Sequence, residues 1–231
     1  MVFRTSAVKE LGFQAVSEPI WDLVIRATAK PASVEAVALT GDVPETGKLT
    51  QPTLPDLAPR EPDSERNWLR AHLDAFSLDE AVEKVGSPAD AVALKAGLLQ
   101  IHDYLDASHE LSQSIEGKGL HRSGDYWHAI MHRREPDYSN SKYWFRSVSS
   151  HPIFEPLGKA VGSLLAETEI PAAETARQKL RAGGKWDPFA FVDFCQDCER
   201  KGDPELTGIA KQIQWQEMQL LLEQTYRDAT G

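Results

Sequence analysis

From about residue 64 to the C-terminus, apolar residues recur at the three- and four-residue spacing of α-helices, and no neighbouring segments alternate as paired strands do. Ser87 followed by Pro88 predicts a helix start, because proline in the first turn loses no hydrogen bond. That helix is predicted to continue through Ile115 and to stop near Gly117. Further helices are expected at about 125–135, 140–148, 153–167, 171–182, 187–201 and 204–228. The fold is therefore predicted to be all-α, an irregular helical bundle.

The N-terminal quarter of the chain differs from this pattern. Residues 1–43 show no clean period, and prolines at positions 44, 52, 55, 59 and 62 interrupt regular structure in the stretch that follows. We therefore expect residues 1–62 to form an extended or weakly structured N-terminal segment with a proline-rich connector. Residues 63–231 are expected to form the helical domain.

Composition excludes several classes of protein. No stretch approaches the roughly 18 uninterrupted apolar residues of a membrane helix, so no membrane partner is expected. The net charge of −10 argues against general binding to nucleic acid. The two cysteines are too few for a disulfide scaffold, and the N-terminus lacks the apolar core of a secretory signal. These features predict a cytoplasmic protein.

Positive charge and histidine are concentrated in the same part of the chain. Residues 117–160 carry a net charge of +3, whereas residues 61–116 carry −8. Six of the seven histidines fall between positions 102 and 151, where chance would place one or two. A random solvated surface seldom combines a local excess of positive charge with a local excess of histidine, so we expect a functional site in this region.

The histidines have a spacing that would align them on helix faces. Positions i, i+4 and i+7 lie on one side of an α-helix. Two sets of residues have that spacing: His102, Asp106 and His109 on one predicted helix, and His128, His132 and Glu135 on the next. If these helices pack antiparallel, four imidazoles and two carboxylates face each other. We therefore expect the four histidines as ligands of one divalent transition metal (zinc, iron, nickel or manganese), with Asp106 or Glu135 accepting a proton from metal-bound water.

Two other interpretations of the histidines stay open. A His-x-x-x-His pattern is common, and Asp106 could simply hydrogen-bond a buried structural histidine. A polar pocket lined by histidine without a metal is the other alternative. Glu135 directly precedes Pro136, which disfavours the helical conformation at Glu135 and could spoil its alignment with His132.

The segment 132–146 also brings together cationic and polar side chains. Arginine offers a planar pair of donors that suits carboxylate or phosphate. Lys142 and Arg146 share a helix face, where their like charges call for a negative partner. We therefore expect a pocket for a small anionic molecule, with hydrolytic or proton-transfer chemistry as its candidate reaction. Its expected ligand-binding residues are Arg133, Arg134, Asn140, Lys142, Tyr143 and Arg146.

Two alternatives to an anion pocket remain. The basic segment 117–160 could make the protein a non-catalytic interaction module that docks the acidic segment of a second chain, including a second copy in a homo-oligomer. The same segment could instead pair internally with residues 61–116. For Arg133 and Arg134, a further explanation is the helix C-terminus, which favours cations without any ligand.

The central segment resembles a known recurring motif. The hallmark of a family of uncharacterised bacterial and fungal proteins resembles the segment GDYWHAIMHRREPDYSNSKYWFRSVSSHPIF. Other recurring stretches of that family are similar to IHDYLDASHELSQSIE and to the C-terminal WQEMQLLLEQTYRDA. The resemblance covers roughly residues 99–155 and 210–228 and implies no activity. It implies only that one set of side chains forms a unit: His109, His128, His132, Arg133, Arg134, Glu135, Asn140, Trp144 and Arg146.

Overall fold

The protein is described by a computed structural model that covers residues 54–59, 67–180 and 185–231. Within these ranges the chain forms nine α-helices and one short 3-10 helix, with no strand, which confirms the all-α prediction. The expectations for residues 1–53 and 60–66 lie outside the described residues. Residues 54–59, the described part of the proline-rich connector, are not helical, and Leu57 among them is buried.

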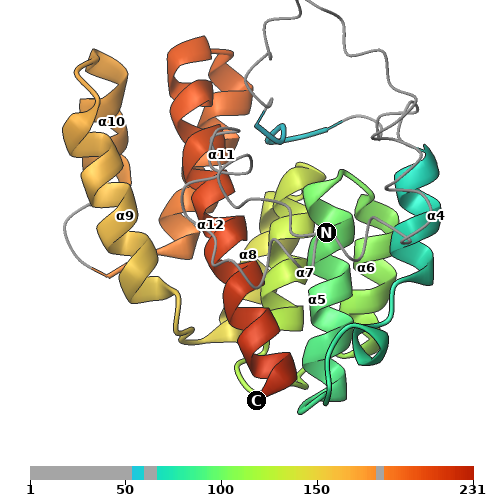
Figure 1. The fold of residues 1–231 in the computed structure, drawn as a ribbon. Coiled ribbons are helices and arrows are strands. Elements are labelled where there is room, and N and C mark those ends of the chain that lie inside the picture. The colour runs from blue at the N-terminus through green and yellow to red at the C-terminus, as the bar shows by residue number, and fades with distance from the viewer. Residues whose placement is uncertain (1–53, 60–66, 181–184) are drawn as a thin grey trace, which may run out of the picture.

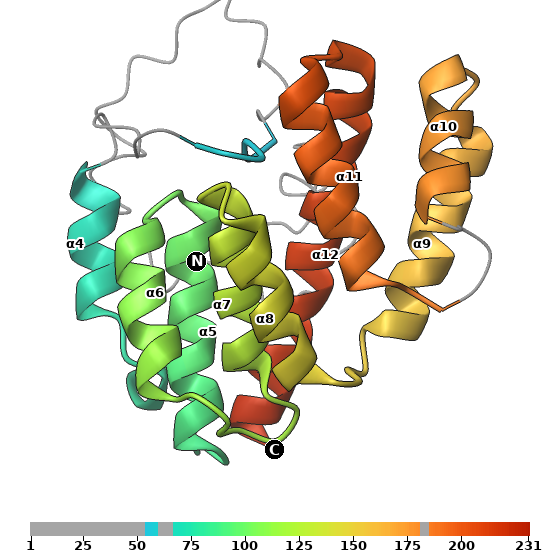
Figure 2. The same cartoon turned by 180° about the vertical axis from the view of Figure 1, so that it is seen from behind.

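The helices form two groups, and the C-terminal helix α12 packs against both (Figures 1 and 2). Helices α5 to α8 pack together with α4 on their outer side, and α9 and α10 form a pair on the opposite side of the molecule. Between them lie α11 and α12. The bounds in chain order are α4 (Asn67–Ala75), η2 (Leu78–Glu80), α5 (Pro88–Ile101), α6 (Leu105–Ser114), α7 (Ser123–Arg134), α8 (Tyr138–Val148), α9 (Phe154–Glu167), α10 (Pro171–Leu180), α11 (Pro188–Lys201) and α12 (Pro204–Thr230).

Most helix starts occur where the sequence predicted them, for a local reason. The Ser87 side chain accepts a hydrogen bond from the backbone N–H of Asp90 at the start of α5. Asp187 and Asp203 accept from the first N–H groups of α11 and α12 in the same way, and a proline follows each of the three caps. These side chains satisfy backbone donors that have no partner inside the helix.

The predicted helix through Ile115 is wrong, because the chain forms two helices there. Asp103 adopts a left-handed conformation with φ of 68° directly after the C-cap His102. The N–H of Tyr104 then donates to the carbonyl of Leu99, and the N–H of Asp103 to that of Gln100. This is the Schellman arrangement that ends a helix. It turns the chain between α5 and α6, so that His102 and His109 belong to different helices.

Helix α7 is the most enclosed element of the bundle. All of its residues, Ser123–Arg134, are buried, including its histidines and arginines. It packs against α5, α6 and α8, and it also touches α12. A helix that is buried all round has no solvent face for its polar side chains. Each polar group on α7 must therefore find a partner inside the protein or serve a site.

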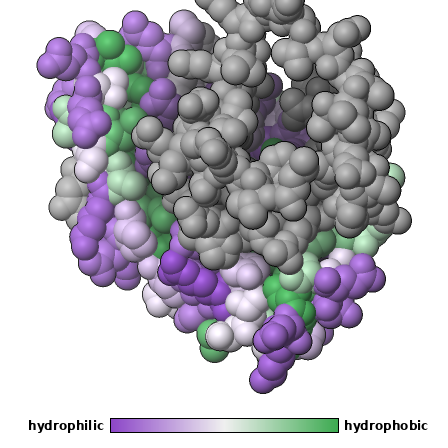
Figure 3. All heavy atoms as spheres, in the orientation of Figure 1, coloured by the Kyte–Doolittle hydropathy of each residue, from purple (hydrophilic) through white to green (hydrophobic). Residues whose placement is uncertain are grey.

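Helix α12 extends along the whole molecule (Figures 1 and 2) and packs against α5, α9, α10 and α11. It is 27 residues long. None of the helices in the described part of the chain combines the length and apolarity needed to cross a bilayer. The described surface in Figure 3 is mostly hydrophilic, with hydrophobic residues confined to narrow strips.

Candidate metal centre

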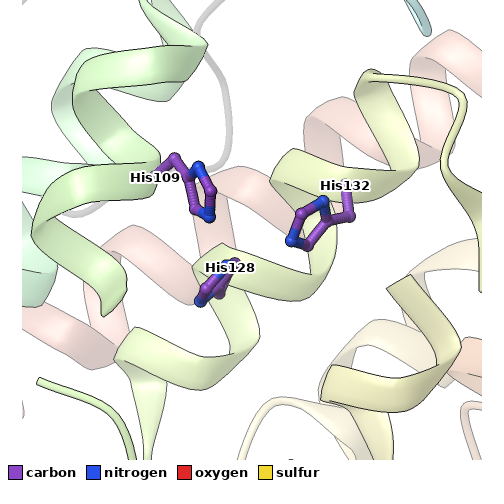
Figure 4. A group of neighbouring side chains, drawn as sticks. All are labelled: His109, His128 and His132. Atoms are coloured by element: carbon purple, nitrogen blue, oxygen red, sulfur yellow. The ribbon is translucent and has the colours of Figure 1, made fainter. Parts of the chain in front are cut away.

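Three imidazoles meet between α6 and α7. His109 comes from α6, and His128 and His132 lie one turn apart on α7, with all three rings directed toward one another (Figure 4). Their candidate ligand atoms all lie within 4.8 Å of one another. The ring centroids are 4.7 Å apart for His109 and His128, and 5.2 Å for His109 and His132. We refer to His109, His128 and His132 as the histidine trio.

The centre of the trio is a buried imidazole without hydrogen bonds. His128 is only 1% exposed, and neither of its ring nitrogens has a hydrogen-bond partner among the described residues. Its ring stacks on Trp144 of α8 at 3.8 Å between centroids. The neighbouring His132 has a partner, since the side-chain amide nitrogen of Asn140 lies 3.0 Å from its Nε2. Helix α8 thus contacts the trio through Trp144 and Asn140.

The surroundings keep the imidazoles of His128 and His132 neutral. Burial, together with the nearby His132 and His109, lowers the pKa of His128 to about 3. Burial and His109 lower the pKa of His132 to about 4. At neutral pH both rings therefore carry no charge, which is the form in which histidine binds metal ions.

Glu135 is the carboxylate nearest to the trio. It is the C-cap of α7, so it has left the regular helix as Pro136 suggested, yet its Oε2 lies 3.4 Å from His132 Nδ1. Burial raises the pKa of Glu135. Asp106, the other expected proton acceptor, lies in the first turn of α6 with an exposed side chain.

His102 is not part of the trio. The sequence placed it on one helix face with Asp106 and His109, but α5 ends at Ile101 and His102 is its C-cap. The expected four-histidine set is therefore corrected to three. The helix face that would have aligned His102 and His109 does not exist, because the chain turns at Asp103.

Arg133 has an internal partner in place of the expected ligand. Its guanidinium donates to Glu217 Oε2 of α12 at 2.5 Å, and both side chains are fully buried. The guanidinium carbon also lies 4.5 Å from the ring centroid of Phe191 on α11. Glu217 accepts a second hydrogen bond from the hydroxyl of Tyr126 at 2.9 Å. Arg133 therefore joins α7 to α11 and α12.

Arg134 is likewise engaged inside the protein. It donates to the carbonyl of Gln100 at 2.6 Å, to the carbonyl of Asp56 and to the carboxylate of Asp103. These partners belong to the end of α5, to the proline-rich connector and to the turn before α6. Arg134 thus joins three segments, and its guanidinium is not offered to a ligand.

The other expected anion-binding residues do not converge on one place. Lys142 forms an ion pair with Asp193 of α11 at 2.5 Å. Tyr143 is 56% exposed, and Arg146 is exposed as well. Only Asn140 among this set touches the histidine trio. Among the described residues, the ion pair between the basic segment and the acidic segment is that of Arg134 with Asp103. Arg133 and Lys142 pair instead with α12 and α11.

Two further histidines form a separate group with its own partners. His151 Nε2 lies 3.1 Å from the hydroxyl of Ser123, and its Nδ1 accepts from the backbone N–H of Ile153. His121 Nδ1 lies 2.8 Å from a carboxylate oxygen of Asp228 near the end of α12. These contacts fit structural histidines, unlike the unpaired ring of His128.

Sequence reasoning missed two features of this region. No residue spacing in the sequence predicts that Trp144 stacks on His128, although the family resemblance placed the two residues in one unit. A cleft beside the trio, with a volume of about 750 Å³, is lined by residues that include Asp103, Tyr104, Glu135 and Glu199. Glu199 carried no signal, because it reaches the cleft from α11, far along the chain.

No family model, no curated protein and no solved structure matches this chain. The resemblance of the central segment to an uncharacterised family therefore stays a sequence-based expectation. Function is inferred below from the geometry of the trio and its surroundings.

Proposed function

We propose that the protein is a metal-dependent hydrolytic enzyme whose ion binds to the histidine trio. The observation that carries the proposal is His128, whose two ring nitrogens are buried and unpaired among the described residues while two more imidazoles face them. An unsatisfied buried polar group costs about 1–3 kcal/mol. A bound ion would supply the missing partner, and it would explain why three imidazoles gather between α6 and α7.

The donor set favours a particular class of ion. Imidazole nitrogens suit zinc, iron, nickel and copper, whereas magnesium and calcium prefer oxygen ligands. A tetrahedral zinc site places its nitrogen ligands about 3.4 Å apart. The candidate ligand atoms of the trio lie within 4.8 Å of one another, so the rings would have to rotate inward to share one ion. Of the expected metals, we propose zinc first, with iron, nickel and manganese as alternatives.

Three protein ligands leave one position for water, as in catalytic zinc sites. Glu135, whose carboxylate lies 3.4 Å from His132 Nδ1, would be the proton acceptor next to such an ion. A bound zinc would supply a water of lowered pKa as the nucleophile for the hydrolysis of an acyl bond. Glu135 would take the proton of that water and pass it to the leaving group as the acyl bond breaks.

The surroundings favour a cation over an anion at the trio. Arg133 and Arg134, the cations expected to bind a small anionic molecule, are engaged by internal acceptors. Glu135 and Asp106 instead place carboxylates near the histidines. Lys142, one of the cations on which a non-catalytic interaction module would rest, also has an internal partner. The two free cysteines are consistent with the proposed location in the reducing cytoplasm.

The test is metal analysis of the full-length chain without a histidine tag. After zinc loading and dialysis we expect one zinc per chain by elemental mass spectrometry. His128→Leu and His132→Gln should lose the ion, whereas His102→Gln, outside the trio, should keep it. Circular dichroism checks that each variant is folded. No zinc in the folded wild type, or equal loss in His102→Gln, would refute the metal site.

The hydrolytic part is tested with 4-nitrophenyl acetate as a probe. The zinc-loaded protein should hydrolyse this ester faster than the metal-free protein. Glu135→Gln should keep its zinc and lose about 10²- to 10⁴-fold in rate, the usual contribution of a positioned acid or base. If zinc binds and no hydrolysis exceeds that of the metal-free chain, the centre is not hydrolytic.

A further inference from the structure

A buried carboxamide lies where α5, α6 and α7 meet. Gln100, near the end of α5, is 0% exposed. In the orientation that satisfies both ends of the amide, its nitrogen donates to the hydroxyl of Ser108 at 3.1 Å and to the backbone carbonyl of Trp127 at 3.0 Å. Its oxygen accepts from the backbone N–H of Met131 at 2.9 Å. One side chain therefore joins α5 to both helices that carry the histidine trio.

The partners of this carboxamide have a particular place in the sequence, because each directly precedes one histidine of the trio. The pairs are Ser108 and His109, Trp127 and His128, and Met131 and His132. Two of the hydrogen bonds are made to backbone groups, and the third to the short side chain of serine. Gln100 thus fixes the chain immediately before each of the three imidazoles.

The two contacts with α7 fall on a single turn of that helix. Trp127 and Met131 are four residues apart, the spacing at which a backbone carbonyl and an N–H face each other in an α-helix. A side chain that enters this row of hydrogen bonds is one of the identifiable causes of a local bend. Gln100 therefore acts on the turn that separates His128 from His132.

The backbone of Gln100 is held as firmly as its side chain. Its carbonyl accepts from Arg134 Nη1 at 2.6 Å and from the N–H of Asp103 at 3.1 Å. Arg134 ends α7, so this helix contacts both the main chain and the side chain of Gln100. A buried polar network whose members are all satisfied makes its surroundings rigid.

We propose that Gln100 is a positioning residue of the metal centre, which sets the spacing of the three imidazoles around one ion. The inference rests on the proposed function, because it concerns the ion that the trio would bind. Gln100 would not touch the ion. It would act through the backbone of the three ligands, and their rings would then need only to rotate.

Cobalt(II) is the probe for the test, because it can replace zinc and its visible absorption reports the geometry of its ligands. Titration of the full-length, metal-free chain with cobalt gives both the affinity and the spectrum. Gln100→Met keeps the length of the side chain and removes its three hydrogen bonds. It should weaken cobalt binding by about 10- to 100-fold, the usual effect of losing a residue that orients metal ligands, and change the visible spectrum.

Gln214→Met is the matched control. Gln214 of α12 is also 0% exposed and donates to the backbone carbonyl of Asp56, so its replacement also removes a buried hydrogen bond. Its partners, unlike those of Gln100, do not precede the trio. This variant should keep the cobalt spectrum of the wild type and an affinity within about twofold.

A second variant covers the case in which Gln100→Met does not fold, which circular dichroism would show. Ser108→Ala removes only the contact before His109. It should weaken cobalt binding about threefold or more and change the spectrum in the same direction. If Gln100→Met is unfolded, Ser108→Ala decides the test.

Three outcomes would overturn the inference. A deciding variant with the affinity and spectrum of the wild type would refute the positioning role and leave the metal site in place. Equal weakening in Gln214→Met would show a general effect of lost stability and would refute the role as well. A wild-type chain that binds no cobalt would refute the proposed function, and the role of Gln100 with it.

Discussion

Replacing His128 with leucine should stabilise the metal-free protein. The imidazole is 1% exposed, and its two nitrogens lack partners in the described part of the structure. Each such group costs about 1–3 kcal/mol. Leucine removes both and fills a similar volume, but it loses the stacking on Trp144, worth about 0.5–1.5 kcal/mol. We expect a net gain of about 1–3 kcal/mol in the free energy of unfolding.

The measurement is urea unfolding at pH 7 in the presence of a chelator, with thermal unfolding as a second readout. For a chain of this size each kcal/mol should raise the Tm by about 2–4 °C. His151→Leu is the matched control, since His151 is also buried but is hydrogen-bonded to Ser123 and Ile153. That variant should lose about 1–3 kcal/mol. If His128→Leu destabilises the protein as much as His151→Leu does, the unpaired imidazole is not the cost that the metal proposal assumes.

Three further perturbations test the packing around the site. Glu217→Gln leaves the buried charge of Arg133 without its counter-ion and should lower the free energy of unfolding by about 3–5 kcal/mol in urea; an effect below about 1 kcal/mol would contradict the buried pair. Gly97→Ala places a methyl group 2.5 Å from the Trp127 ring and should cost about 1–3 kcal/mol, whereas Gly162→Ala, in open space on α9, should be neutral or stabilising by up to about 1 kcal/mol in the same assay. The free energy of unfolding should also fall as the pH drops from about 6 to 4. His128, His132 and His151 have pKa values of about 3 or 4 in the folded protein, so over this range they take up protons only after unfolding, and each lowers the free energy of unfolding by up to about 1.4 kcal/mol per pH unit. A urea midpoint that stays constant over that range would refute the lowered pKa values.

The helices were largely readable from the sequence because their signals are local. Ser87 with Pro88 marks a start through a cap and a fixed backbone angle, and the structure has that start. The break at Asp103 was not readable. Helices most often end this way at glycine, and an aspartate in the left-handed conformation gives no comparable signal. Its carboxylate is then held by Arg134, a contact that only the folded chain creates.

The sequence predicted the part of the site that lies within one helix, but not the contacts between helices. His128 and His132 are one turn apart on any helix, so their proximity followed from the sequence. The addition of His109 required the packing of α6 on α7, and the removal of His102 required the turn between α5 and α6. Arg133 was expected to bind a ligand because the sequence shows no partner for it nearby. Its partner Glu217 lies on α12, and no local pattern links two residues so far apart in the chain.

The enclosure of α7 has a consequence for how the centre would exchange its ion. His128 and His132 lie on a helix whose residues are all buried, so its backbone amides cannot meet solvent unless neighbouring helices separate. We expect these amides to be among the slowest to exchange with deuterium, with opening energies near that of global unfolding. The backbone of such a centre would stay fixed, so the centre would adjust to an ion through rotation of its side chains, and the ion would enter and leave past Glu135 and His109, its more exposed members.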